Sequence, residues 1–335
     1  MVIDDTFYMR LCLDAAWEFQ GRTYPNPPVG ALLLSPDGRI LSVGAHKKAG
    51  CAHAELDAIV KALPRDIVLQ NLTSPTKQHE HLLAHYRNAF YGYTLYVTLE
   101  PCMHYGSTPP CSLLIETLGF SRVVIGTDDP NPKASGSAAY LGSIGRKIEV
   151  GILQEECRTL ITPFLKWQKK EPFVYFKLAK TQNGIITGGT ITSLEARTHV
   201  HSLREKVDLL VIGGETIRTD RPRLDCRLIG SSYAPDILIY SHRKDFDRSI
   251  PLFGIPGRNV YIENRLERVK RYRNVMIEGG ERMLKATQKI TDWYLFYTTS
   301  SFKRGTCLQS EMHFAPLYCR SLHNESLSWY QKENE

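Results

Sequence analysis

The sequence of 335 residues lacks a long hydrophobic run. No stretch approaches the roughly 18 apolar residues that a membrane-spanning helix needs. The N-terminal segment MVIDDTFYMR is acidic before any apolar stretch, where a secretory signal would be basic. We therefore expect a soluble cytoplasmic protein that has no membrane partner.

The pattern of a disulfide scaffold and a dense run of basic residues are also absent from the sequence. Eight cysteines spread over this length do not form a disulfide scaffold, so we expect free thiols or metal ligands. The net charge is +7, and residues 172–335 hold all of the excess, with 25 Lys+Arg against 18 Asp+Glu. No dense basic run with interleaved aromatics indicates a nucleic-acid partner, and phosphorylated small molecules explain a basic half equally well.

The pattern of apolar residues predicts two α/β domains. In the first half, helices are expected at 7–19, 54–63, 112–118 and 152–167, and strands at 29–34, 40–44, 94–99 and 122–126. A polar linker at 168–172 then separates a domain of residues 1–167 from one of residues 172–335. The second half repeats the alternation, with strands such as FVYFKLA, DLLVIGG and NVMIEGG.

A polar segment between Pro64 and Tyr91 interrupts the first domain. It holds His79, His81 and His85, but no cysteine accompanies them. A metal role is conceivable, yet a surface insertion that contains a short helix is the better interpretation.

The combination His53-Ala54-Glu55, then Pro101-Cys102 and later Cys111, predicts a catalytic zinc site. Three protein ligands leave a fourth position for water, whose pKa a bound zinc lowers to about 7. A carboxylate beside that water can carry its proton to a departing amine, and we assign this role to Glu55. His-x-Glu followed by Pro-Cys-x-x-Cys is the signature of zinc deaminases.

The spacing of the two cysteines departs from that signature, because eight residues separate Cys102 from Cys111. Gly106 and the prolines at 109 and 110 allow a loop that returns the second thiolate to the first. A structural zinc or a pair of buried free thiols would also fit this spacing. We interpret His104 as a substrate contact, since a fourth protein ligand would close the site to water.

The second half lacks the G-x-G-x-x-G fingerprint of Rossmann dinucleotide-binding domains. Two glycine pairs, at 213–214 and 279–280, end predicted strands instead, where the backbone could approach a ligand. Five arginines could bind phosphate: Arg204, Arg218, Arg221, Arg223 and Arg227.

Several segments together resemble the bifunctional riboflavin-biosynthesis deaminase–reductase family. They are TYPNPPVGALL, HAELDAI, PCMHYGSTPPC, DDPNPKASG, FKLAKTQNGIIT, GGETIRTDRPRLDCRL and NVMIEGG, so the resemblance covers nearly the whole chain. It implies a cytidine-deaminase-like α/β/α sandwich followed by a dihydrofolate-reductase-like α/β domain. It also implies deamination of 2,5-diamino-6-(ribosylamino)pyrimidin-4-one 5′-phosphate and NADPH-dependent reduction of the ribosyl chain to ribityl. A homodimer or larger homo-oligomer is a further expectation from the family.

The resemblance also implies roles for individual residues. Besides the zinc ligands, it assigns the deaminase substrate to Asn26, Asp129 and Asn131. It assigns the reductase substrate to Arg204, Leu224, Arg227 and Glu278, and NADPH to Lys180, Thr216, Asp220, Ser241, Gly279 and Gly280.

Three positions depart from the family pattern. Ser107 replaces a basic residue, Asn183 an aspartate and Thr190 an aromatic residue. The changes at Asn183 and Thr190 leave open the alternative that the chain is a deaminase whose second domain has lost the reductase activity. An RNA base deaminase and a non-catalytic metal-binding module are also compatible with the sequence.

Overall fold

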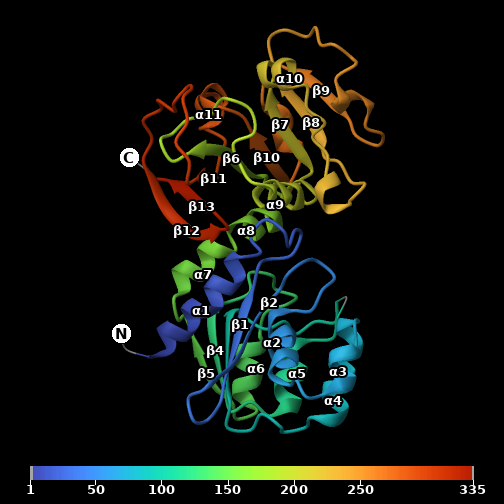
Figure 1. Ribbon diagram of the computed structural model, residues 1–335. Helices are drawn as coiled ribbons and strands as arrows, with labels where there is room; N and C mark the ends of the chain where they lie inside the picture. Colours follow the sequence, from blue (N-terminus) through green and yellow to red (C-terminus); the bar gives the residue numbers. More distant parts are fainter. Residues whose placement is uncertain (1–2, 107, 334–335) are drawn as a thin grey trace. The chain divides into compact units, whose positions relative to one another are not determined.

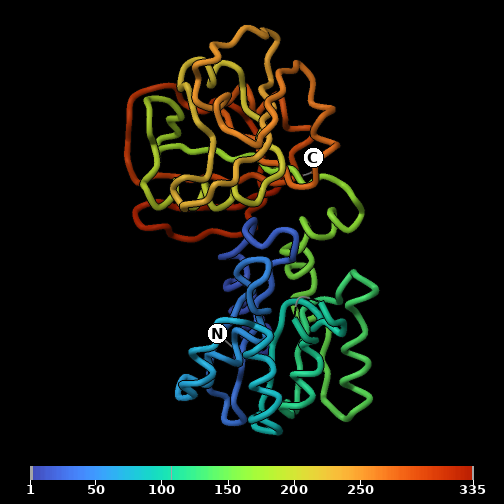
Figure 2. The backbone as a smooth tube through the Cα atoms, turned by 90° about the vertical axis from the view of Figure 1, so that its right-hand side faces the viewer, coloured from blue at the N-terminus to red at the C-terminus, as the bar shows by residue number. Residues whose placement is uncertain are grey.

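The computed structural model describes residues 3–106 and 108–333. The chain divides between Gln168 and Lys169 into two compact units, each with its own sheet. Figure 1 labels most of their elements, and the tube in Figure 2 follows the first unit from blue to green and the second from green to red.

A five-stranded mixed sheet forms the centre of the first unit, in the order β2-β1-β3-β4-β5. β1 pairs antiparallel with β2 and β3, whereas β3, β4 and β5 are parallel. The strands are β1 (Gly30–Leu34), β2 (Ile40–Ala45), β3 (Thr94–Leu99), β4 (Arg122–Thr127) and β5 (Lys147–Val150). Because β3 and β4 are parallel, their carboxyl ends meet at one edge of the sheet.

Helices cover both faces of this sheet, which is the expected sandwich (Figure 1). Alternate side chains such as Leu33, Val97 and Ile125 join a core with α2, α4, α5 and α6, while Tyr8 of α1 contacts Tyr96 on the other face. The helices are α1 (Asp5–Trp17), α2 (Ala54–Ala62), α3 (Ile67–Asn71), α4 (Pro75–His85), α5 (Cys111–Leu118), α6 (Ser137–Ser143), α7 (Gln154–Leu160) and α8 (Thr162–Gln168).

The single helix predicted over 152–167 is wrong. The chain leaves the helix at Ile161, which ends α7, and α8 begins at Thr162. Pro163 explains the break, because proline has no N–H to donate to the preceding turn and its ring clashes with the carbonyl four residues back.

Close packing fixes the start of α2, the helix that follows His53. A Cβ atom on Gly44 of β2 would lie 2.4 Å from the backbone nitrogen of Ala58. Glycine is therefore required where β2 and α2 touch, and the approach holds α2 firmly on the sheet.

The second unit is built on an eight-stranded sheet in the order β12-β13-β11-β6-β10-β7-β8-β9. The six strands from β11 to β9 are parallel, and β12 and β13 add an antiparallel hairpin. The strands are β6 (Phe173–Thr181), β7 (Leu209–Gly213), β8 (Asp236–Tyr240), β9 (Val260–Glu263), β10 (Asn274–Glu278), β11 (Trp293–Thr299), β12 (Phe314–Leu322) and β13 (Glu325–Lys332).

Three α-helices of the second unit connect parallel strands: α9 (Leu194–Arg204), α10 (Gly214–Asp220) and α11 (Glu281–Thr287). Short 3₁₀ turns occupy Arg227–Ile229, Pro251–Gly254 and Glu267–Arg271. Since β6 and β10 are neighbours and parallel, residues at their carboxyl ends meet, as in the first unit.

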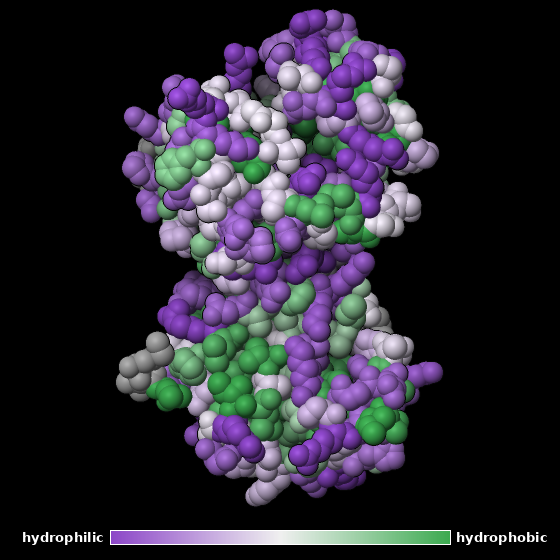
Figure 3. Space-filling model, viewed as in Figure 1, coloured by the Kyte–Doolittle hydropathy of each residue, from purple (hydrophilic) through white to green (hydrophobic). Residues whose placement is uncertain are grey.

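On the face drawn in Figure 3, apolar side chains reach the surface of the first unit near α1, and the second unit is mostly hydrophilic. Within the described residues, no helix has the length and apolarity to cross a membrane.

Candidate functional site

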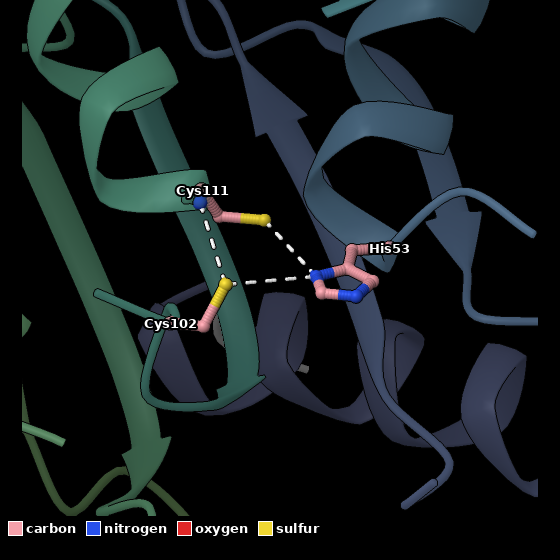
Figure 4. A group of neighbouring side chains, drawn as sticks. All are labelled: His53, Cys102 and Cys111. Atoms are coloured by element: carbon pink, nitrogen blue, oxygen red, sulfur yellow. Dashed lines mark hydrogen bonds between the residues drawn. The ribbon is translucent and has the colours of Figure 1, made fainter. Parts of the chain in front are cut away.

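Three side chains from distant segments converge in the first unit (Figure 4). His53 immediately precedes α2, Cys111 is the first residue of α5, and Cys102 lies in the loop after β3. Among the described residues, their nearest ligand atoms form a group in which all atoms lie within 4.8 Å of one another. These three residues could therefore hold one metal ion.

The distances in this group fit a tetrahedral zinc. His53 Nδ1 lies 3.7 Å from Cys102 Sγ and 3.3 Å from Cys111 Sγ. Zn–N and Zn–S bonds of about 2.0 and 2.3 Å at a tetrahedral angle separate nitrogen and sulfur by about 3.5 Å. On the other side of the ring, His53 Nε2 lies 3.5 Å from Thr108 Oγ1, which could orient the imidazole.

The electrostatic setting favours a thiolate at Cys102. Both α2 and α5 begin at the site, so their positive ends face it. The hydrogen bond with Cys111, and then that with His53, lowers the pKa of Cys102 to about 4, while the bond with Cys102 raises the pKa of Cys111. The backbone N–H of Cys111 also donates to Cys102 Sγ at 3.4 Å. Metal binding needs such deprotonated sulfur.

Glu55 lies in the first turn of α2 and is 4% exposed. It does not belong to the three-residue group, and burial raises the pKa of its carboxyl. A buried carboxyl of raised pKa beside a metal site is suited to exchanging protons at neutral pH.

A cavity of about 420 Å³ opens beside the three residues. His104, an exposed residue outside the metal-ligand group, lines it. Ser107, where the family has a basic residue, lies outside the described residues. The other residues assigned to this site that line the cavity are Asn26, His53, Glu55, Cys102, Asp129 and Asn131.

His46 orients Asn26. No motif or spacing in the sequence predicts this role. Its Nδ1 lies 2.9 Å from the carbonyl of Ala52 and must donate to it, so its Nε2 accepts from the Asn26 amide at 3.2 Å. Burial lowers the pKa of His46 to about 4, which keeps the ring neutral. The amide oxygen of Asn26 is therefore the atom left to face the cavity.

Glu100, at the end of β3, holds the segment that carries Asp129 and Asn131. Its carboxylate accepts from the backbone N–H groups of Gly136 and Ala138, both at 3.0 Å, and of Asp129 at 3.3 Å. The side chain is 6% exposed. This buried carboxylate fixes one wall of the cavity and the start of α6.

A second cavity, of about 460 Å³, lies in the second unit. Arg204 donates to Glu278 through two nitrogens, at 2.8 and 3.0 Å, so these two predicted contacts are paired with each other. Arg227 donates to Asp225 at 2.5 Å. The predicted residues that line the cavity are Arg204, Thr216, Asp220, Leu224, Arg227, Glu278, Gly279 and Gly280.

Two residues assigned to NADPH do not line this cavity. The ammonium of Lys180 lies 5.8 Å from the centre of the Phe296 ring, and Ser241 donates to the carbonyl of Arg243. Ser241 also packs on Gly214, which explains the glycine at 214. The roles of Lys180 and Ser241 stay predictions.

Lys177 reaches the second cavity instead. Residues three apart on a strand face opposite sides, so Lys177 and Lys180 cannot share a face. Lys177 pairs in register with Glu278 of β10, and burial lowers the pKa of its ammonium. The sequence carried a signal for it, because a lysine inside the apolar run FVYFKLA needs a buried partner.

The two residues of the second unit that depart from the family pattern differ in their relation to the cavity. Asn183 forms a turn, donating to the carbonyl of Lys303 at 2.8 Å, and does not line the cavity. Thr190 does line it.

Known proteins resemble both units. Residues 2–127 match the cytidine and deoxycytidylate deaminase zinc-binding region, and residues 172–300 match the RibD C-terminal domain. Riboflavin biosynthesis protein RibD of Aquifex aeolicus is 36% identical over 238 residues, which are 69% of this chain and 60% of that protein. RibD of Corynebacterium ammoniagenes is 30% identical over 306 residues, which are 86% of this chain and 84% of that protein.

The fold agrees with these matches. The crystal structure of a diaminohydroxyphosphoribosylaminopyrimidine deaminase/5-amino-6-(5-phosphoribosylamino)uracil reductase from Thermotoga maritima has a TM-score of 0.63 and 26% identity, with 98% of both chains covered. The predicted fold class is thus confirmed. The matches to the RibD proteins of Aquifex aeolicus and Actinobacillus pleuropneumoniae span only 60% and 55% of their lengths. The Corynebacterium relative is matched over 84% of its length, and the Thermotoga structure over 98% of both chains. The chain therefore belongs to the RibD family of riboflavin biosynthesis proteins.

Proposed function

We propose that this chain catalyses two consecutive steps of riboflavin biosynthesis. The first is hydrolytic deamination of 2,5-diamino-6-(ribosylamino)pyrimidin-4-one 5′-phosphate, and the second is NADPH-dependent reduction of the ribosyl chain to ribityl. One observation carries the proposal: His53, Cys102 and Cys111 converge beside the buried Glu55 at a cavity. A cytoplasmic location and a homo-oligomer stay predictions from the sequence.

In the first unit, water replaces an exocyclic amine of the pyrimidine, and ammonia leaves. Zinc held by His53, Cys102 and Cys111 would supply a water-derived nucleophile at neutral pH. The Glu55 carboxylate takes up a proton from water and delivers it to the departing amine nitrogen. Asn26 presents its amide oxygen to the pyrimidine edge, because His46 engages its amide nitrogen.

In the second unit, NADPH would supply the hydride, so the role of the chain's residues is to bind the substrate and NADPH and to position them for the transfer. Glu278 and Lys177 lie side by side on β10 and β6 within the cavity, where they would contact the hydroxyls of the ribosyl chain. The partly exposed side chain of Arg227 remains able to reach the 5′-phosphate.

The test supplies the zinc-loaded chain with the phosphorylated diaminopyrimidinone, with and without NADPH. We expect ammonia in both cases, and NADPH oxidation in step with consumption of the deaminated product. Ammonia without NADPH oxidation would leave a deaminase only, as the Thr190 position allows. The absence of both ammonia release and NADPH oxidation would refute the proposal. Salt-sensitive binding of transfer RNA would then favour the RNA base deaminase.

A further inference from the structure

The histidine-containing segment between α2 and β3 is built into the first unit. Leu69 of α3 and Leu82 of α4 are fully buried in the core cluster of that unit. Asp66 accepts from His81 and from Tyr86, both at 2.7 Å, and so ties the segment to itself. The prediction of a surface insertion is therefore only partly correct, because one face of α4 belongs to the core.

His79 is the polar residue on that buried face. It is 1% exposed, and its Nε2 lies 3.1 Å from the carbonyl oxygen of Pro110. A carbonyl can only accept, so Nε2 carries the proton and donates. The segment thus reaches the residue that immediately precedes Cys111.

The peptide group between Pro110 and Cys111 is held from both sides. Its carbonyl accepts from His79, and its N–H donates to Cys102 Sγ at 3.4 Å. The atoms of a peptide group lie in one plane, so a rotation that breaks one of these bonds strains the other. Hydrogen bonds in such a chain also polarise one another, which strengthens the N–H donation to sulfur.

We propose that His79 is a positioning residue of the metal centre. By donating to the Pro110 carbonyl, it fixes the plane of the Pro110–Cys111 peptide at the start of α5. The fixed peptide in turn holds the sulfurs of Cys102 and Cys111 in position near His53. The segment between α2 and β3 thereby becomes part of the support of the metal site. This inference rests on the zinc site of the proposed function.

The test compares variants of the full chain after loading with zinc. His79→Leu removes the donor, His79→Gln places an amide nitrogen where Nε2 lies, and His79→Asn has an amide too short to reach. His81→Leu is the matched control, since it makes the same change two residues away on the same helix, at a contact with Asp66. Zinc release to a chromogenic chelator, the visible spectrum of the cobalt-substituted chain, and kcat and KM for deamination are measured.

We expect His79→Leu and His79→Asn to release zinc about tenfold or more faster than the wild type, as for other residues that support metal ligands. Their cobalt spectra should change and kcat should fall while KM stays close to that of the wild type. His79→Gln should restore all three properties, and His81→Leu should leave them unchanged even if the melting temperature falls.

Zinc release from His79→Leu that matches the wild type, or that His81→Leu reproduces, would overturn the inference. So would a His79→Gln variant that behaves like His79→Leu. A wild-type chain that takes up no zinc would instead remove the proposed function, and this inference with it.

Discussion

Glu55 combines two properties that separate its proposed role from that of the candidate metal ligands. It is buried in the first turn of α2, two residues after His53, and it is not part of the ligand group. Burial raises the pKa of its carboxyl, so it can hold a proton in one step and release it in another.

Substitution Glu55→Gln should therefore separate metal binding from chemistry. The amide has the same size but cannot carry a proton, so deamination should fall about a hundredfold or more. Zinc content should stay near that of the wild type, as judged by metal analysis of the purified chain. Loss of zinc together with activity would mean that Glu55 is needed for the metal site itself.

His201 lines the second cavity and should make the stability of the second unit depend on pH. Burial, and then the charges of Arg204 and Arg227, lowers its pKa to about 4, and its Nδ1 accepts from the N–H of Leu228. Below pH 6.5 the unfolded chain binds a proton that the folded chain does not, so the free energy of unfolding should fall from pH 7 to pH 5.

Denaturant titrations at the two pH values measure this effect. His201→Gln should reduce the difference between pH 7 and pH 5, whereas the same change at the exposed His242 should not. An unchanged difference in His201→Gln would contradict the assignment of the effect to His201.

At the scale of single residues, the sequence predicts the candidate metal ligands but not the buried histidines that hold neighbouring parts of the site in place. His53, Glu55, Cys102 and Cys111 stand in a spacing that the chemistry requires. His46 and His79 stand in no such spacing, because their roles arise from burial and from neighbours far along the chain. Contacts of this kind can be recognised only in the three-dimensional structure.

At the scale of elements, the site depends on how segments end. β3 is followed directly by Glu100, whose carboxylate accepts from backbone N–H groups at the start of α6 and in the segment that carries Asp129. A carboxylate that accepts from several N–H groups stabilises such a loop more than a neutral acceptor does.

Substitution Glu100→Gln should therefore loosen the segment. Its amide keeps the shape of the side chain but loses the charge and places an N–H among donors, so we expect the first unit to lose about 1 to 3 kcal/mol of stability. KM for deamination should rise more than kcat falls, because the cavity wall is affected and the metal ligands are not. A fall in kcat alone would contradict this interpretation.

The elements that the sequence predicts well are those with a strong apolar pattern, and β3 begins and ends where expected. The hairpin of β12 and β13 was not predicted. β12 is mostly half-buried or exposed, contains Pro316 and has an irregular register next to it. An edge strand of this kind has little apolar alternation and tolerates proline, so its sequence resembles a loop.

At the scale of the whole molecule, each unit has its own sheet and its own cavity, and the described residues that line each cavity all come from that unit. We therefore expect the two proposed activities to be separable by mutation.

Matched isosteric variants test this separation. Glu55→Gln should keep NADPH-dependent reduction of the deaminated substrate. Glu278→Gln should keep deamination while reduction falls about tenfold or more, since Arg204 loses the charge and one of the two oxygens to which it donates. Both rates are followed in the same preparation. A variant that lost both activities while remaining folded would show that the units depend on each other.

The strand order also has a consequence for how the chain acquires its structure. In the first unit, β1 and β2 are neighbours in sequence and can pair at once. In the second unit, the first strand, β6, finds its partners only in β10 and β11, with Phe173 opposite Asn274. Such long-range pairing requires a large loop to close before contacts form, which slows folding. The first unit should thus become ordered early during synthesis, and the second should remain open until the residues of β10 have emerged.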